Sequence, residues 1–338
     1  MGLSNIKKIG ALGVLFCSLI LVSCGENKIN IDKVEGVKLN RGSITENQKG
    51  IYSNYNFQSG KYNKIEGEDI VGIYDYESGN YISEEDGKYV GFYNGKNVML
   101  EGVGQNDIKL NLSPKGEYVS YFTKDSDDIF IAKVRSLEDG KEVNFRPKVI
   151  FSWRDMDWLD DKTLIYYGTS DDGIYGVYIY NLENGKEELI YELKGGLIQF
   201  IKSTEDGAVF LQETIDDKKS LKVIDKNSKE VSIINEDIVE ISDILKSGDE
   251  YYVLGKKINS GYAIFKLKNN TATRITYDYP QSINSEKGLS IDEEGNILFI
   301  GADKELDKSR VYKCSKDGSV GRVSEEGKDF TFINRSIR

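Results

Sequence analysis

Histidine is absent from all 338 residues of the chain. The chain alone therefore cannot assemble a Ser-His-Asp or Cys-His catalytic arrangement, or any zinc site with histidine ligands. A general base would have to be a carboxylate, a lysine, a tyrosine or a cysteine.

Cysteine is nearly as scarce, with Cys17 and Cys24 near the start of the chain and Cys314 near its end. If the first segment is removed and Cys24 is modified, Cys314 is the only remaining thiol and no intramolecular disulfide can form. Cys314 follows the alternating run Val311–Lys313, which predicts a small, buried apolar residue in a strand.

Proline occurs only 3 times and no basic run is present, whereas the chain has 22 tyrosines and 34 glycines. This balance favours pleated sheet with many turns over long helices. A formal charge of −11 makes nucleic acid an unsuitable partner, because binding it depends on lysine and arginine neutralising phosphates. With 39% hydrophobic and 30% charged residues, the composition is that of a globular protein with a large core.

The first 24 residues contain a positive pair, Lys7-Lys8, and then a short apolar run over Ile9–Ile20. The run is too short for a typical membrane-spanning helix. The sequence Leu21-Val22-Ser23-Cys24 follows, and it resembles the lipobox of bacterial lipoproteins. In that family the cysteine thiol receives a diacylglycerol group and becomes the new N-terminus. The alternative is an ordinary secretory signal with a cysteine there by chance.

The resemblance implies a signal peptide at residues 1–23, lipid attachment at Cys24 and a polar tether over 24–45. Acyl chains such as palmitate would hold the mature protein on the extracytoplasmic face of a bacterial cell membrane, since two or more chains give stable attachment. A short strand near Val37–Leu39 is a secondary expectation within the tether.

Two series of turns run along the rest of the chain in step with each other. Asn-Gly and Asp-Gly pairs suit two-residue hairpins because both central positions need positive φ. The first series contains Ser78-Gly79, Lys115-Gly116, Asp160-Asp161, Asp206-Gly207, Ser247-Gly248 and Glu294-Gly295. The second contains Ser59-Gly60, Asn94-Gly95, Asp139-Gly140, Asn184-Gly185, Asn227-Ser228, Asn269-Asn270 and Asp317-Gly318.

The stretch Ile108–Val143 displays one whole unit, with alternating apolar residues in four short segments separated by turns. Four antiparallel strands of this kind form one blade of a β-propeller. A parallel solenoid could have a similar period, but it would lack two antiparallel hairpin turns in each repeat.

Within this unit, Leu112-Ser113-Pro114-Lys115-Gly116-Glu117-Tyr118 resembles the Ser-Pro-Asp-Gly-Lys signature of TolB-type, WD40-like propeller repeats. Trp158–Tyr166 and Ile291–Phe299 keep weaker forms of it. The resemblance covers residues 46–338 and implies architecture. The Gly-His pairs of true WD40 repeats are missing, since the chain has no histidine.

The turns give six complete blades, one unpaired hairpin at Ile51–Ile65 and one unpaired strand at Phe330–Ile333. Joining these segments would create a seventh blade from both ends of the chain and remove exposed sheet edges. We therefore predict an all-β propeller of seven four-stranded antiparallel blades over residues 46–338. A six-bladed ring with extra end strands is the alternative.

Acidic clusters at Asp125–Asp128, Asp171-Asp172 and Asp216-Asp217 fall in the expected loops between second and third strands. They lack the spacing of a calcium loop, so solvated loop tips are the preferred interpretation. Gly102-Val103-Gly104 lacks the helix and the Lys-Ser/Thr of a phosphate-binding loop. No metal or cofactor site is predicted.

The densest aromatic and charged cluster is Phe151–Trp158, which holds both tryptophans. Packing is its simplest role, but Trp153, Arg154 and Asp155 could face a ligand from an inner strand. Tyr277 and Tyr279 occupy the corresponding entry to a later blade and are weaker candidates.

These observations predict a non-enzymatic, membrane-anchored module that binds a protein, a peptide or a glycan, or that serves as an assembly platform. TolB-like propellers are associated with such roles at the cell envelope, and this expectation comes from the resemblance. The alternative is a carboxylate-dependent glycan hydrolase or lyase, which needs no histidine.

Overall fold

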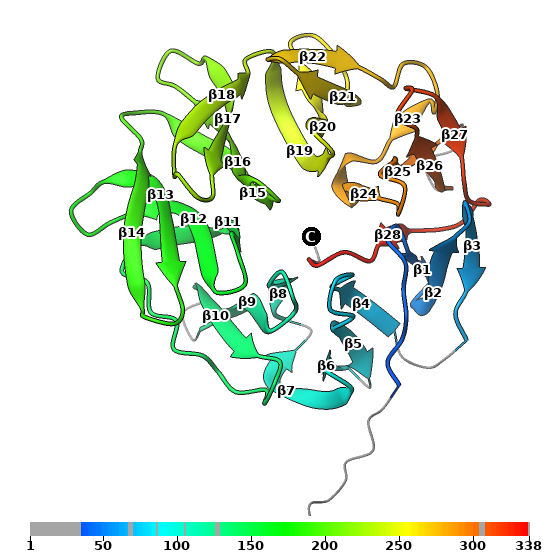
Figure 1. Cartoon of the computed structure of the whole chain (residues 1–338), viewed down its shortest axis with the longest axis horizontal. Helices are drawn as coiled ribbons and strands as arrows, with labels where there is room; N and C mark the ends of the chain where they lie inside the picture. Colours follow the sequence, from blue (N-terminus) through cyan, green and yellow to red (C-terminus); the bar gives the residue numbers. More distant parts are fainter. Residues whose placement is uncertain are drawn as a thin grey trace, which may run out of the picture. The chain divides into compact units, whose positions relative to one another are not determined.

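Seven small antiparallel sheets surround a central channel in the computed structural model of the chain (Figure 1). The structure describes residues 35–66, 70–85, 87–104, 106–125, 129–303 and 308–336, without the side chains of 70 and 152–155. The described residues form short strands and a single turn of 3-10 helix. No helix among them has the length and apolar character needed to cross a membrane.

Blades 2, 4, 5 and 6 each contain four consecutive strands, ordered from the channel outward. Blade 2 contains β4 (Ile70–Tyr74), β5 (Tyr81–Glu85), β6 (Lys88–Tyr93) and β7 (Lys96–Gly104). Blade 4 contains β11 (Ile150–Trp158), β12 (Thr163–Thr169), β13 (Tyr175–Asn181) and β14 (Lys186–Glu192). Blade 5 contains β15 (Leu197–Thr204), β16 (Gly207–Glu213), β17 (Lys219–Asp225) and β18 (Val231–Asn235). Blade 6 contains β19 (Ile238–Ser247), β20 (Glu250–Lys257), β21 (Ala263–Lys268) and β22 (Thr271–Arg274).

Blade 1 joins the two ends of the described chain. Its strands are β28 (Phe330–Phe332), β1 (Ile44–Gln48), β2 (Ile51–Gln58) and β3 (Lys61–Lys64). β28 pairs antiparallel with β1, and Ile44 lies opposite Phe332. The predicted seven-bladed ring, closed by terminal strands, is thus confirmed over its six-bladed alternative. The N-terminal part supplies three strands, whereas its turn predicted only a two-stranded hairpin. Val37 and Leu39 form no strand and pack against blade 2.

Blades 3 and 7 depart from the regular pattern. Blade 3 contains β8 (Ile108–Leu112), β9 (Tyr118–Lys124) and β10 (Phe130–Ser136), and its expected fourth strand is reduced to one bridge between Arg135 and Glu142. The last segment of the Ile108–Val143 unit, expected as a strand at Glu142 and Val143, was thus wrongly predicted: beside the bridge it makes one hydrogen bond, from Val143 N to Val134 O (2.8 Å), and Phe145 beyond it is buried in the core. In blade 7 the inner strand is split into β23 (Ser282–Ile283) and β24 (Leu289–Ile291) by η1 (Ser285–Lys287), followed by β25 (Ile297–Ala302), β26 (Arg310–Cys314) and β27 (Val320–Arg322).

The second strand of a blade is the most deeply buried, because neighbouring blades cover both of its faces. All six residues of β25 and the first six of β16 are buried. One core cluster combines Leu211 and Leu221 of blade 5 with Val253 and Phe265 of blade 6. Each such side chain contributes about 1.5–3 kcal/mol through burial, so packing between blades stabilises the ring.

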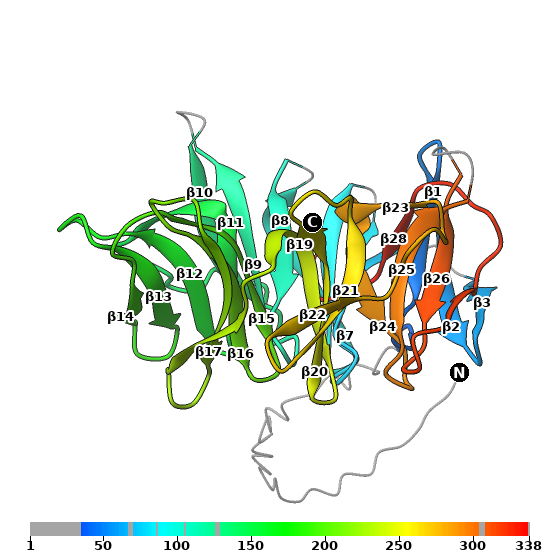
Figure 2. The same ribbon diagram turned by 90° about the horizontal axis from the view of Figure 1, so that it is seen from above.

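The two ends of the ring carry different connections. Turns between second and third strands, such as the blue β1–β2 turn at the top right of Figure 2, lie at the upper end together with the links between blades. Turns between first and second and between third and fourth strands lie at the lower end. After β28, residues 333–336 enter the channel (Figure 1), where Tyr74 N donates to Asn334 O (2.9 Å) and Leu112 N donates to Arg335 O (2.7 Å).

Candidate functional site

The predicted residues Trp153, Arg154 and Asp155 belong to inner strand β11, but their side chains lie outside the described residues. Their role stays a prediction. The second tryptophan of the cluster, Trp158, is 1% exposed and its Nε1 donates to Asn111 O at 3.0 Å. Trp158 therefore acts in packing between blades 3 and 4, as its simplest interpretation predicted.

Tyr277 and Tyr279 lie on the link between β22 and β23 and line a common hollow of about 740 Å³ at the upper end. Their side chains are 66% and 40% exposed. The link can approach blade 7 because residue 301 is glycine: a Cβ there would lie 2.6 Å from Ser282 O and 2.9 Å from Pro280 Cγ. We call this hollow the tyrosine hollow.

Each of the two tyrosine rings has an arginine over one face. The guanidinium carbon of Arg274 lies 5.5 Å from the centre of the Tyr277 ring, and that of Arg322 lies 5.7 Å from the Tyr279 ring. Arg322 also pairs with Asp303 at 2.7 Å. Arg274 donates through Nε to Thr276 O, and it makes no ion pair with a described residue. Among the described residues, the hollow thus offers two aromatic ring faces, the donors of Arg274 and Arg322, and in Arg274 a cation that forms no ion pair.

Tyr312 of β26 is buried and packs against Tyr279, with their rings edge to face at 5.5 Å. Its hydroxyl donates to Asp303 at 2.6 Å. Burial and this contact with Asp303 raise the pKa of Tyr312 well above its ordinary value, so the hydroxyl stays a donor to Asp303 even at a pH where an ordinary tyrosine ionises. Sequence inspection missed Arg322, Asp303 and Tyr312, because only folding brings them to Tyr279. Arg274, three residues before Tyr277, was the one local signal.

A second hollow, of about 680 Å³, is the lower part of the central channel. Two carboxylates of inner strands line it, and both are held by neighbouring blades. Asp157 accepts hydrogen bonds from Asn111 Nδ2 (2.7 Å) in blade 3 and from Ser203 N (2.8 Å) in blade 5. Such bonds fix the carboxylate as a structural link between blades.

Asp243 has the same role two blades further on and is only 1% exposed. It accepts from Lys202 Nζ (2.6 Å) of blade 5 and from Leu289 N (2.7 Å) of blade 7. Asp157 and Asp243 therefore hold neighbouring blades together, and their oxygens are already occupied by donors of the protein.

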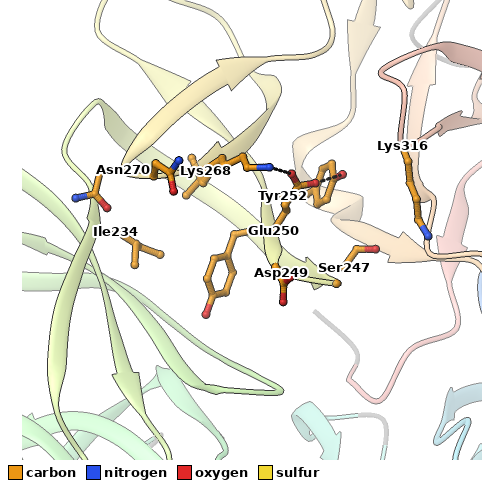
Figure 3. Close-up of a pocket in the computed structure, with 12 residues that line it drawn as sticks. Ile234, Ser247, Asp249, Glu250, Tyr252, Lys268, Asn270 and Lys316 are labelled. Atoms are coloured by element: carbon orange, nitrogen blue, oxygen red, sulfur yellow. Dashed lines mark hydrogen bonds and ion pairs between the residues drawn. The ribbon is translucent and has the colours of Figure 1, made fainter.

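A third hollow, of about 560 Å³, lies at the lower end beside blade 6 (Figure 3). Glu250 pairs there with Lys266 (2.6 Å) and Lys268 (3.3 Å), and the hydrogen bond from Lys266 is the main cause of its lowered pKa. Lys316 approaches from blade 7 and makes no ion pair with a described residue. No arginine is among the described residues that line this hollow, so it lacks the arginine-tyrosine pairs of the tyrosine hollow.

The acidic loops form no metal centre among the residues that the structure describes, and 126–128 lie outside them. In one of these loops, hydrogen bonds from Lys218 and Thr214 lower the pKa of Asp216 to about 2. It is a solvent-exposed carboxylate paired with its own loop.

No family model and no curated protein matches the sequence. Among solved structures, the chain is similar to the uncharacterized protein lmo1340 from Listeria monocytogenes EGD-e, with 13% identity, a TM-score of 0.53, and coverage of 87% of this chain and 94% of that one.

Similarity extends to prolyl oligopeptidase B from Galerina marginata, with 13% identity, a TM-score of 0.52 and coverage of 72% of this chain and 41% of that one. TolB from Acinetobacter baumannii also matches, with 12% identity, a TM-score of 0.47, and coverage of 87% and 67%. The chain spans about two-fifths of the length of the oligopeptidase. At these identities the likeness is one of fold, and by its fold the chain is a seven-bladed β-propeller.

Proposed function

We propose that this chain is a binding module whose ligand, a protein, a peptide or a glycan, occupies the tyrosine hollow. The observation that carries the proposal is the pair of exposed rings, Tyr277 and Tyr279, each with an arginine over one face. Large aromatic surfaces with polar neighbours bind sugars and peptides well, because they combine contact area with few lost rotamers.

The proposal includes the absence of enzymatic activity. The chain has no histidine, and the channel carboxylates Asp157 and Asp243 accept hydrogen bonds from the protein itself. A carboxylate-dependent glycan hydrolase or lyase is the competing class. A turnover screen on cell-wall and host polysaccharides distinguishes the two: cleavage abolished by one Asp or Glu substitution would replace the binding proposal.

Binding at the hollow is tested with the Tyr277→Ala/Tyr279→Ala double variant. Both side chains are exposed, so the fold should be unaffected while affinity falls at least about tenfold. The measurement is titration calorimetry against cell-wall glycan fragments and peptides that bind the parent protein. Tyr52→Ala is the control, because Tyr52 is 49% exposed at the upper end of blade 1, outside the hollow. Equal loss in the control, or none in the double variant, argues against this site.

We further propose that Cys24 carries a lipid and anchors the propeller on the outer face of the cell membrane. The support is the Leu21–Cys24 motif after a short apolar run. Cys24→Ala should release the protein from the membrane fraction or leave an uncleaved precursor, whereas Cys17→Ala should change neither. Unchanged membrane attachment of Cys24→Ala, measured by fractionation, would defeat this assignment.

A further inference from the structure

Exposed large apolar side chains gather at the upper end of the ring. Twelve of the fourteen found among the described residues lie in upper-end loops or links, or in the first two residues of strands that begin there. The twelve are Ile51, Tyr52, Ile129, Ile131, Ile150, Ile174, Tyr175, Leu197, Ile215, Ile258, Tyr277 and Tyr279. The other two, Met99 and Ile233, lie on outer strands β7 and β18. The two ends of the propeller therefore differ in polarity.

Five of these side chains lie on the neighbouring blades 4 and 5, and together we call them the upper apolar patch: Ile150, Ile174, Tyr175, Leu197 and Ile215. Backbone pairing connects the blade 4 members, since Ile150 and Tyr175 both lie opposite Thr169. Leu193 N, on the link to blade 5, donates to Tyr175 O at 2.8 Å. Leu197 then begins β15 opposite Glu213, beside the loop of Ile215.

Two glycines bring the blade 4 to blade 5 link against the Ile215 loop. Gly196 has φ +81°, and a Cβ there would lie 1.9 Å from Glu213 O. A Cβ on Gly195 would lie 2.6 Å from Ile215 Cδ1. The side chain of Ile215 therefore rests on the link, yet it remains 81% exposed, and Ile150 is 76% exposed. The backbone holds these apolar groups outward in a fixed arrangement.

Carboxylates predominate around the upper apolar patch. Asp171, Asp172 and Asp217 are exposed, and they make no ion pair with a described residue. Asp216 is neutralised by Lys218 at 2.7 Å. Glu192 is a further exposed carboxylate. The positive charges of the exposed Lys148 and Lys194 partly offset these carboxylates. The patch combines an apolar centre with a net negative rim.

We propose that the upper apolar patch docks a protein partner whose contact surface carries aliphatic side chains flanked by lysine or arginine. An apolar centre with a charged rim is the ordinary composition of a protein interface, and opposite charges on the partner complete it. The proposal is independent of the tyrosine hollow, which lies on the link between blades 6 and 7.

Charge argues against two other occupants. A bilayer rich in anionic lipid would repel the carboxylates, since such membranes attract lysine and arginine. In a two-fold dimer the same patch would face itself, so Asp171 and Asp172 of one copy would meet like charges of the other. Neither objection applies to a partner with basic flanking residues.

The test uses short fluorescent peptides in which leucine alternates with lysine, glutamate or serine, measured by anisotropy with the full chain. The leucine-lysine peptide should bind best and lose affinity at high salt, because exposed charges are then screened. Ile150→Ser/Ile215→Ser should weaken binding at least about tenfold, since apolar anchors dominate interfaces. Asp171→Lys/Asp172→Lys should shift preference to the leucine-glutamate peptide.

Ile258→Ser is the matched control, because Ile258 is 73% exposed at the same end but on blade 6. It should leave peptide affinity within about twofold of the parent. Equal affinity for all three peptides, no binding of any, or unaltered binding by Ile150→Ser/Ile215→Ser would overturn the proposal. Binding to phosphatidylglycerol vesicles, or a dimer in sedimentation, that this double variant abolishes would assign the patch to a membrane or to a second copy and overturn it as well. The two sites are distinguished if Ile150→Ser/Ile215→Ser loses peptide binding while Tyr277→Ala/Tyr279→Ala retains it.

Discussion

At the scale of single residues, Cys314 is a buried thiol whose reactivity is set by its surroundings. It is 1% exposed in β26, and burial raises its pKa from 9.0 to about 11. In a form lacking residues 1–24, we expect the folded protein to react with a disulfide reagent at pH 8 at least about 100-fold more slowly than the urea-unfolded protein, because only the thiolate reacts. Ser319→Cys, which introduces an exposed thiol, is the rapidly reacting control. Equal rates for the two cysteines would contradict the burial of Cys314.

The same shift makes a small part of the stability depend on pH. The native state holds the Cys314 proton more tightly than the unfolded chain does. This contribution is complete below pH 9 and is lost as pH rises from about 9 toward about 11. Lysines and tyrosines also titrate in this range. The measurement is therefore the difference in the free energy of unfolding between the parent and Cys314→Ala, which should shrink over that interval.

Gly196 is a residue whose missing side chain is required by the fold. An alanine Cβ would lie 1.9 Å from Glu213 O, at a φ of +81° that alanine rarely adopts. We expect Gly196→Ala to lower the free energy of unfolding by roughly 2–4 kcal/mol. Gly321→Ala is the control, since no atom lies within 4 Å of its added Cβ. Denaturant unfolding measures both, and similar midpoints would refute the steric argument.

At the scale of elements, Asp243 on β19 joins three blades. Alanine at this position would deprive Lys202 Nζ and the backbone N–H groups of Ile244 and Leu289 of an acceptor. Leaving buried donors unsatisfied costs about 1–3 kcal/mol each, so Asp243→Ala should lower stability by at least about 2 kcal/mol. Asp249→Ala, at an exposed turn after the same strand, should be nearly neutral. A small effect at Asp243 would mean that water replaces the carboxylate.

At the scale of the whole molecule, stability depends on joining the two chain ends in blade 1. Deleting residues 328–338 removes Phe330, Phe332 and Ile333, which are 6%, 4% and 1% exposed. Their burial contributes roughly 1.5–3 kcal/mol each, comparable in sum with a typical net stability of about 5–15 kcal/mol. The truncated soluble form should therefore melt far below the parent, whereas Thr331→Ala should not. A melting temperature within a few degrees of the parent would show that ring closure by β28 is dispensable.

The sequence by itself determined the architecture of the ring. Turn pairs such as Asn94-Gly95 and Asn269-Asn270, in which both residues have positive φ, mark hairpins because positive φ is a property of adjacent residues, independent of distant contacts. Asn184-Gly185 lies instead in a longer connection between β13 and β14, where Gly185 has positive φ and Asn184 does not. Period-two alternation then identifies the strands, and the unpaired strand near Phe330 identifies the closure. Cys314 was likewise predicted as a buried residue from its neighbours in one strand.

Tertiary structure alone decided how side chains from different blades meet. Lys202 and Leu289 reach Asp243 from 41 and 46 residues away, and Arg322 reaches Tyr279 across a blade. Such contacts depend on the position of each strand along the ring axis and on its orientation. Both change at bulges such as those of β19. The sequence does not predict that the exposed apolar residues gather at the upper end of the ring. Alternation indicates on which face of a strand a residue lies, but it does not indicate at which end of the ring that residue lies.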